Sequence, residues 1–231
     1  MTTMTSTLIK PINPITPTTS LTQNDYIMII DVETNGFPEK LDFYTYHNYT
    51  MTEKYNNSRI IQISWGLYDK AGTLIKIVDY YVKPNGFTIT NSEYHGITNE
   101  IVNEQGIDIK VIFRKLFTDL KKTSTVVGHN LMFDEHIILS ELYRNKFVQT
   151  IEEFKKKQRH CTGIGTIDLL NIKLEKGANK MPSLDELYFW CFKEHTENAH
   201  NAKYDVLNTA KCYFYVKSGK WKATHKPQKI S

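Results

Sequence analysis

The most constraining feature of the sequence is an apolar run, Tyr26-Ile-Met-Ile-Ile30, that ends directly in Asp31. A run without polar alternation is typical of a strand that is buried on both faces, as the central strands of α/β sheets are. Asn35-Gly36 and Pro38 then interrupt the pattern. We therefore predict that ordered structure begins near residue 25 with a central strand of a covered sheet.

The segments that follow predict the remaining architecture. Residues 59–67 and 73–82 have the composition of strands, and the short turn 69–72 between them indicates a hairpin. Later segments alternate between the two kinds of structure, with helices at about 111–120, from Asn130, at 184–193 behind the cap Ser183 and at 202–217, and a strand at 125–128. This order predicts a single α/β domain with a mixed sheet flanked by helices.

Composition sets the outer limits of that domain. Hydrophobic residues make up 40% of the 231 residues, which is enough for a sizeable core and unlike a disordered protein. Residues 1–24 are rich in Thr and Pro and contain no acid, so we expect a disordered tail there. Residues 219–231 are basic and acid-free, and we expect a second flexible tail. The folded domain is accordingly predicted to span residues 25–218.

Cysteine usage and hydropathy indicate the compartment. The three cysteines are scattered, without a CxxC pair, which argues against a disulfide framework and for a reducing environment. The N-terminus lacks the apolar segment of a secretory signal, and no apolar run approaches the roughly 18 residues of a membrane helix. We expect a soluble protein of the cytoplasm or nucleus that is neither secreted nor membrane-bound. Its oligomeric state is not indicated.

Asp31 and Glu33 are the first candidates for chemistry. Side chains two apart in a strand point to the same face, so the two carboxylates converge at the strand end. Adjacent carboxylates raise one another's pKa unless a cation compensates. Oxygen ligands of this type favour Mg²⁺ or Mn²⁺ over zinc. The alternative interpretation is a solvated strand end without function.

Two further clusters contain acids at the start of helices. Asp134 follows the predicted strand 125–128 by one helical turn, where the helix dipole favours a negative charge. His200 precedes the last predicted helix, and Asp205 lies one turn inside it, so both side chains are able to reach one point. Histidine suits proton transfer at neutral pH. Charge complementarity at a helix start, or a surface histidine beside a capping acid, would explain each cluster without catalysis.

Taken together, these clusters resemble the three motifs of the DEDDh exonucleases. The matching peptides are Asp31-x-Glu33-Thr34, His129-Asn130-x-x-Phe133-Asp134 and His200-x-x-x-x-Asp205, in the family's order. This group includes the proofreading subunit of bacterial replicative polymerase, ribonuclease T and oligoribonuclease. Tyr94-His-Gly-Ile-Thr98 resembles another stretch of the proofreading-like members. The resemblance covers about residues 25–217.

The resemblance implies a ribonuclease H-like fold and a two-metal 3′→5′ exonuclease with Mg²⁺ or Mn²⁺. Asp31, Glu33 and Asp205 would be metal ligands, Asp134 would complete the acidic set, and His200 would be the general base. The other motif residues, Thr34, His129 and Asn130, are expected to contact the substrate. The substrate would be the 3′ end of single-stranded DNA or RNA, with DNA favoured. Any polymerase partner would act in trans, as a separate chain.

Two other functional classes remain open at this point. One is an RNA-processing exoribonuclease of the same family. The other is a catalytically silent nucleic-acid-binding adaptor on the same fold, which the intact set of five catalytic residues disfavours. The net charge of +4 permits nucleic-acid binding without demonstrating it. The lysine- and arginine-rich segments are interpreted either as solvated faces or as guides for a strand's phosphates.

Overall fold

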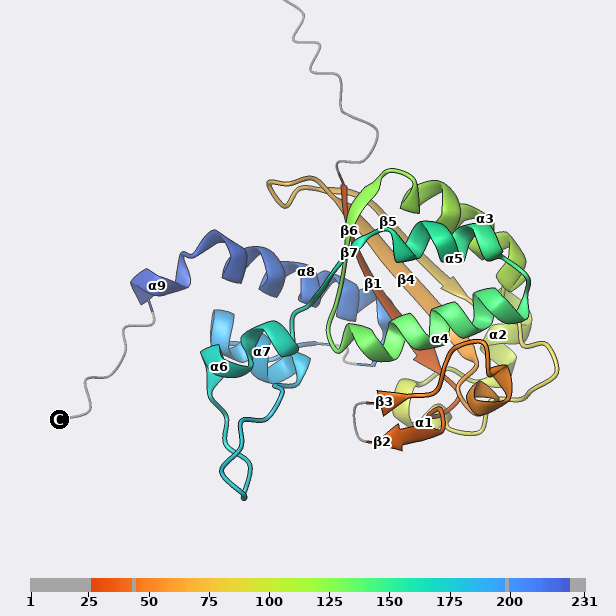
Figure 1. Cartoon of the computed structure of the whole chain (residues 1–231), viewed down its shortest axis with the longest axis horizontal. Helices are drawn as coiled ribbons and strands as arrows, with labels where there is room; N and C mark the ends of the chain where they lie inside the picture. The colour runs from red at the N-terminus through yellow and green to blue at the C-terminus, as the bar shows by residue number, and fades with distance from the viewer. Residues whose placement is uncertain (1–25, 43–44, 198–199, 225–231) are drawn as a thin grey trace, which may run out of the picture.

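A five-stranded mixed sheet forms the centre of the computed structural model, which describes residues 26–42, 45–197 and 200–224. The strand order is β5-β4-β1-β6-β7 (Figure 1). These strands are β1 (Tyr26–Thr34), β4 (Ile60–Tyr68), β5 (Leu74–Tyr81), β6 (Thr123–Gly128) and β7 (Gln158–Cys161). The pairs β1–β4 and β4–β5 are antiparallel, whereas β1–β6 and β6–β7 are parallel. The predicted α/β domain with a mixed sheet is confirmed.

Helices cover both faces of this sheet. The main ones are α3 (Ile109–Leu120), α4 (Leu131–Arg144), α5 (Val148–Lys155), α7 (Leu184–Phe192) and α8 (Ala202–Ser218). Shorter elements are β2 (Lys40–Asp42), β3 (Thr45–Tyr46), η1 (Thr52–Tyr55), α1 (Ser92–His95), α2 (Asn99–Gln105), η2 (Ile164–Thr166), α6 (Ile167–Leu170) and α9 (Trp221–Thr224). Figure 1 shows α3, α4 and α5, in green, on one side of the sheet and α8, in blue, on the other.

The alternation of β1 decides what each face of the strand contacts. Met28, Ile30 and Val32 lie in the core that includes residues of α3 and α4. Ile27 and Ile29 point the other way and pack with Val206 and other residues of α8. Asp31 and Glu33 continue this second series, since side chains two apart share a face. The period of the strand therefore directs both carboxylates toward α8.

Most of the predicted elements are present, with small shifts at their ends. The hairpin of β4 and β5 and the helices α3, α4 and α8 lie where the sequence predicts them. Ser183 accepts a hydrogen bond from the Glu186 amide, and Glu186 accepts one from the Ser183 amide, which together make a capping box for α7. The cap confirms the predicted start of that helix.

Three regions differ from the sequence prediction. The sequence predicts no element between α4 and α7, yet this segment forms α5 and the edge strand β7. The connection 37–58 includes a small hairpin of β2 and β3 and the turn η1. Residues 221–224, predicted to belong to a flexible tail, form α9, and the Trp221 ring packs 5.7 Å from that of Trp190. Residues 1–24 and 225–231 of the two predicted tails lie outside the described residues.

None of the described helices is both long enough and apolar enough to cross a lipid bilayer.

Candidate active site

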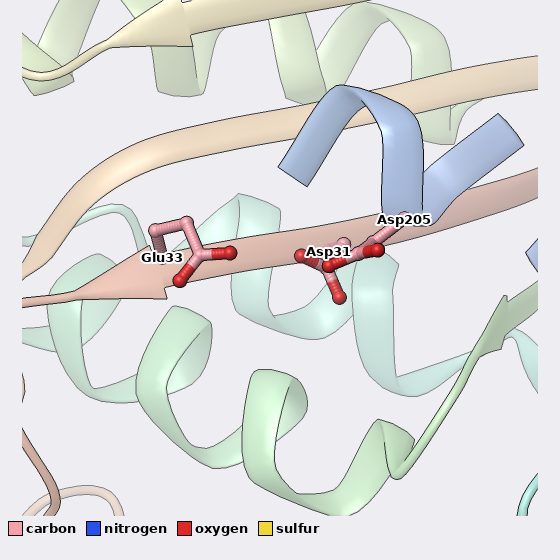
Figure 2. A group of neighbouring side chains, drawn as sticks. All are labelled: Asp31, Glu33 and Asp205. Carbon is pink, nitrogen blue, oxygen red and sulfur yellow. The ribbon is translucent and has the colours of Figure 1, made fainter. Parts of the chain in front are cut away.

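Three carboxylates from two elements meet at the end of β1. Asp31 and Glu33 extend from the strand, and Asp205 extends from the first turn of α8 (Figure 2). One oxygen of each residue lies within 4.8 Å of the others. The strand's two-residue period and the packing of α8 on the same face of β1 together produce this arrangement. The cluster predicted from separate motifs therefore exists as a single site.

Asp134 joins the site through the main chain of β1. Strand β6 ends at Gly128, so β1 has no partner on that side beyond Ile29. The amide of Val32 instead donates a hydrogen bond to Asp134 Oδ1, at 3.0 Å. Asp134 is 2% exposed. This carboxylate therefore replaces a missing ladder partner and is held rigidly beside the two acids of the strand.

The turn between β6 and α4 requires a small residue. A Cβ at Gly128 would lie 2.9 Å from Leu131 Cδ1 and 3.3 Å from the Ile30 carbonyl oxygen. Both contacts are tighter than ordinary packing, and one of them involves the backbone of β1. Gly128 thus allows α4 to start close to the central strand, which brings Asp134 within reach of Val32.

His200 lies where the sequence predicts, on the loop directly before α8. Its side chain is exposed, and its φ of 65° places it in the left-handed region. Asn201 then caps the helix by accepting a hydrogen bond from the Lys203 amide, at 3.2 Å. The loop therefore turns sharply into α8, and the histidine stays accessible to solvent beside Asp205.

Gln62 is a functional candidate that the sequence interpretation did not single out. It is fully buried on β4, directly opposite Glu33 of β1. Its Oε1 accepts a hydrogen bond from the Ala202 amide, at 3.3 Å, and its Nε2 donates to Asp79 Oδ1, at 2.8 Å. Gln62 thus ties the start of α8 to the sheet. The available signal was a polar residue inside the apolar strand pattern of residues 60–63.

Burial and mutual repulsion raise the pKa values of the acidic residues. Burial is the largest cause for each of them. It raises the pKa of Asp31 well above its ordinary value, helped by repulsion from Asp134, Asp205 and Glu33. Burial and then Asp205 raise the pKa of Glu33 to about 7. The pKa of Asp205 rises to about 6, although His200 opposes the rise.

The pKa of Asp134 is also raised by burial, although the hydrogen bond from Val32 opposes the rise. Within the described residues, no Lys or Arg forms an ion pair with any of the four carboxylates. Buried carboxylates that lack a protein cation are stabilised by a metal ion. Their all-oxygen donor set fits divalent cations.

The three residues predicted to contact substrate have different surroundings. The hydroxyl of Thr34 donates to the Gly36 carbonyl, at 2.7 Å. Both ring nitrogens of His129 are bonded inside the protein, to the Thr162 hydroxyl at 3.0 Å and the Pro182 carbonyl at 2.9 Å. His129 therefore holds the loop before α7 against the end of β6. Its contact with substrate, like that of Thr34, stays a prediction.

Asn130 occupies the cap position of α4 without serving as a side-chain cap. Its φ of 61° is left-handed, and its side chain makes no capping hydrogen bond. It lines a cavity of about 590 Å³ together with residues of the β2–β3 hairpin and of the loop before α7. The side chain is thus presented to a hollow beside the first turn of α4. Substrate contact by Asn130 also stays a prediction.

Comparison with solved structures places this fold among the exonucleases. The chain is similar to E. coli Exonuclease I in complex with a dT13 oligonucleotide, at 17% identity and a TM-score of 0.64, covering 87% of this chain and 43% of that one. The zinc-ion-bound form of the E. coli Exonuclease I–ssDNA complex is 18% identical in sequence, with a TM-score of 0.62, and the match covers 86% of this chain and 42% of that one. A moderately thermophilic Exonuclease I from Methylocaldum szegediense is 20% identical, with a TM-score of 0.63, and the match covers 86% of this chain and 41% of that one.

These likenesses establish the fold, which is ribonuclease H-like as predicted. The chain spans less than half the length of the proteins that it matches. No curated protein matches the sequence significantly.

The family assignment comes from the sequence itself. Residues 28–213 match the RNase_T family, described as Exonuclease. The match covers most of the chain and includes Asp31, Asp134 and Asp205, together with the elements that bring them together. The chain therefore belongs to the RNase_T exonuclease family of hydrolytic enzymes.

Proposed function

We propose that this protein is a metal-dependent 3′→5′ exonuclease that removes nucleoside monophosphates from single-stranded nucleic acid, with DNA favoured over RNA. The observation that carries the proposal is the convergence of Asp31, Glu33 and Asp205 within 4.8 Å, without a Lys or Arg partner in the described structure. Repulsion between clustered carboxylates is offset when a metal ion binds among them.

The four acids would hold two divalent cations, Mg²⁺ or Mn²⁺. Asp31, Glu33 and Asp205 have the convergent oxygens, and Asp134 is positioned beside them by its bond to the Val32 amide. When bound, the two ions would lower the pKa of water and neutralise charge on the attacking and leaving oxygens. Four carboxylates balance the charge of two such ions, which limits the repulsion of an approaching polyanion.

His200 would accept the proton of the attacking water. It is exposed on the loop before α8, and it opposes the rise in the pKa of Asp205 in the first turn of that helix. A general base has to reach the reacting water without itself binding the metal ions, because the four acids bind those ions. The hydrogen bond from the Ala202 amide to Gln62 ties the start of α8, directly after His200, to the sheet.

A nucleic-acid strand, rather than a small molecule, is the favoured substrate. Exonuclease I of E. coli, which has the same fold, is described in complex with dT13 and dA16 oligonucleotides. In this chain the 590 Å³ cavity beside Asn130 contains Lys40, Tyr46 and Lys180. Basic and aromatic side chains of this kind support phosphates and bases of single strands. We infer that nucleotides next to the scissile bond occupy this cavity.

The test is degradation of a 5′-labelled single-stranded oligonucleotide with Mg²⁺, compared with the same reaction in EDTA. We expect a ladder of products that shorten from the 3′ end, which EDTA prevents. Asp205→Asn should abolish the ladder, whereas Glu104→Gln, a matched change of an exposed acid on α2, should leave it unchanged. Products that shorten from the 5′ end, or full activity in EDTA, would contradict the proposal. Matched DNA and RNA oligonucleotides then decide the preferred sugar.

A further inference from the structure

A second cavity, of about 600 Å³, is formed without any of the four catalytic carboxylates. Its walls are side chains of the β4–β5 hairpin, of α7, of the loop after α7 and of α8. The hairpin and the helix meet closely at one wall, because a Cβ at Gly72 would lie 3.0 Å from Phe214 Cγ. This cavity also shares no residue with the hollow beside Asn130.

Aromatic and aliphatic side chains provide much of the cavity surface. Tyr204 of α8 is 42% exposed and Leu74 of the hairpin is 40% exposed, although both side chains are large and apolar in character. The rings of Tyr68, Tyr188 and Phe214 extend the same surface. Concave surfaces of this composition are typical of binding sites.

Asn208 is the polar side chain that makes this surface unusual. It is only 7% exposed, yet its side-chain amide makes no hydrogen bond to another described residue. Lys211, one turn further along α8, is by contrast engaged, since its amine donates to the Tyr188 hydroxyl at 3.0 Å. Buried amides are normally paired, so we expect a ligand in the cavity to pair this one. The ligand should therefore combine apolar groups with a hydrogen-bond acceptor.

The N-terminal part of the sequence contains a segment with this chemistry. Pro11, Pro14 and Pro17 are spaced three residues apart. Three is the number of residues per turn of a polyproline II helix, so the three rings would lie along one face. Such a helix has no internal hydrogen bonds, and its carbonyls are free to accept one from an asparagine amide. Grooves lined by aromatic rings are a recurring binding site for helices of this type.

The place where β1 begins brings this segment to the cavity. The first described residue is Tyr26, and the next one, Ile27, is paired with Tyr68, which lines the cavity. The eight residues 18–25 connect this point with Pro17, and they span up to roughly 26–29 Å when extended. The proline segment is therefore within reach of the cavity of its own chain.

Charge favours the same occupant. Residues 1–24 contain no acid and one basic side chain, that of Lys10, next to the first proline of the series. Glu194 and Glu197 line the cavity, and neither forms an ion pair within the described part of the chain. The histidine between them, His195, is already paired with Asp185. The cavity thus has acidic groups available for the lysine.

We propose that residues 10–17 bind in this cavity as a polyproline II helix. The Asn208 amide donates to a carbonyl of the segment, and Lys10 lies near the two glutamates. This contact ties the chain before β1 to α8, the helix that contains Asp205. It replaces the expectation of disorder for residues 10–17, because a segment that cannot fold alone becomes ordered when it binds a surface.

The first test compares the wild-type chain with the full-length variant Pro11→Ser/Pro14→Ser/Pro17→Ser by nuclear magnetic resonance. Loss of the bound segment should shift the side-chain amide signals of Asn208. The side-chain amide signals of Asn103, an exposed residue of α2, serve as the internal control and should not shift. Identical Asn208 signals in the two proteins would overturn the proposal.

The second test adds a synthetic peptide with the sequence of residues 8–18 to both full-length proteins. The triple-serine variant should bind the peptide. Wild type should bind it about 10-fold more weakly, because its own segment competes at an effective concentration on the order of 1 mM. A peptide that binds neither protein would overturn the proposal. Equal binding to both would also overturn it, and would assign the cavity to a segment of another molecule.

Substitutions in the cavity then locate the peptide. In the triple-serine background, Asn208→Leu removes the amide and should weaken peptide binding by about 10-fold, the upper range for one neutral hydrogen bond. Leu74→Lys changes an exposed position of the hairpin and provides a second cavity variant if Asn208→Leu fails to fold. The matched control Asn103→Leu should leave binding unchanged. Unaltered binding in a folded cavity variant would place the peptide elsewhere and refute the proposal.

Discussion

The protein buries acidic side chains in two different ways. On the α3–α4 side of the sheet, Asp119 and Glu141 are each 2% exposed. Asp119 accepts hydrogen bonds from Trp65 Nε1, at 2.9 Å, and from Lys76 Nζ, at 2.6 Å. Glu141 forms an ion pair with Arg59. Each of these acids therefore has a cation from the chain itself.

The acids at the end of β1 have no such partner. Asp31, Glu33, Asp134 and Asp205 are gathered without a Lys or Arg in the described structure, and burial raises the pKa of each. The difference shows that buried charge serves two purposes here. An acid paired within the chain holds elements together, whereas an acid without a partner reserves a place for a metal ion.

The strongest test of this contrast removes an acid from β1. Asp31→Ala or Glu33→Ala should lower exonuclease activity on the order of 10⁴-fold, because metal-ion stabilisation of the transition state amounts to several kcal/mol. The fold should survive, since neither side chain belongs to the apolar core. Activity at saturating Mg²⁺ and circular dichroism together check the prediction. Full activity in either variant would show that these acids do not bind the metal.

His200 tests whether the same site contains a base. His200→Ala should reduce turnover by about 10²–10⁴ while leaving the Mg²⁺ concentration for half-maximal activity nearly unchanged. At saturating metal, the acidic limb of the wild-type pH–rate profile should be absent from the variant, because the variant lacks the proposed general base. The measurement is a pH–rate profile of both proteins. An identical acidic limb in both would assign the proton transfer to another group.

A substitution of Arg59 tests whether the ion pair with Glu141 stabilises the fold. Arg59→Met should lower the free energy of unfolding by about 3–5 kcal/mol, because it removes the ion-pair partner of the buried Glu141. The double variant Arg59→Met/Glu141→Gln should recover much of this loss, since it removes the isolated charge. Urea unfolding at neutral pH measures all three proteins. A loss below about 1 kcal/mol in the single variant would mean that the ion pair is not structural.

The metal-free protein should reveal the unpaired acids through pH. Burial raises the pKa of Glu33 from 4.5 to about 7 and that of Asp205 from 3.8 to about 6. The folded state therefore binds more protons than the unfolded chain in this range. The stability that these bound protons contribute is fully present below pH 4 and is lost as the pH rises through about 7; it amounts to at most about 6 kcal/mol.

Denaturant titrations at pH 5 and pH 8, in EDTA and in Mg²⁺, test this expectation. Mg²⁺ and the variant Glu33→Gln should each reduce the fall in stability. If the EDTA curve is flat between these pH values, the acids are compensated by groups of the chain itself.

How much the sequence alone determined is clearest at β1. The apolar run predicted a central strand, and the two-residue period placed Asp31 and Glu33 on one face, because alternation is a property of the local backbone. The positions of Asp134 and Asp205, one turn inside their helices, were also predictable from local caps. The order of the motifs then sufficed to predict the fold and the acidic set.

Other features were decided only by the tertiary structure. β7 comes from the polar segment Gln158–Cys161, whose largely exposed side chains show no alternation, and it is a strand because β6 offers a free edge. Gln62 gains its role from lying opposite Glu33 and from accepting the hydrogen bond of the Ala202 amide. Local periodicity specifies which way a side chain points. What lies opposite it depends on how distant segments pack, and that packing determines which buried groups are paired and which are left for a metal or a substrate.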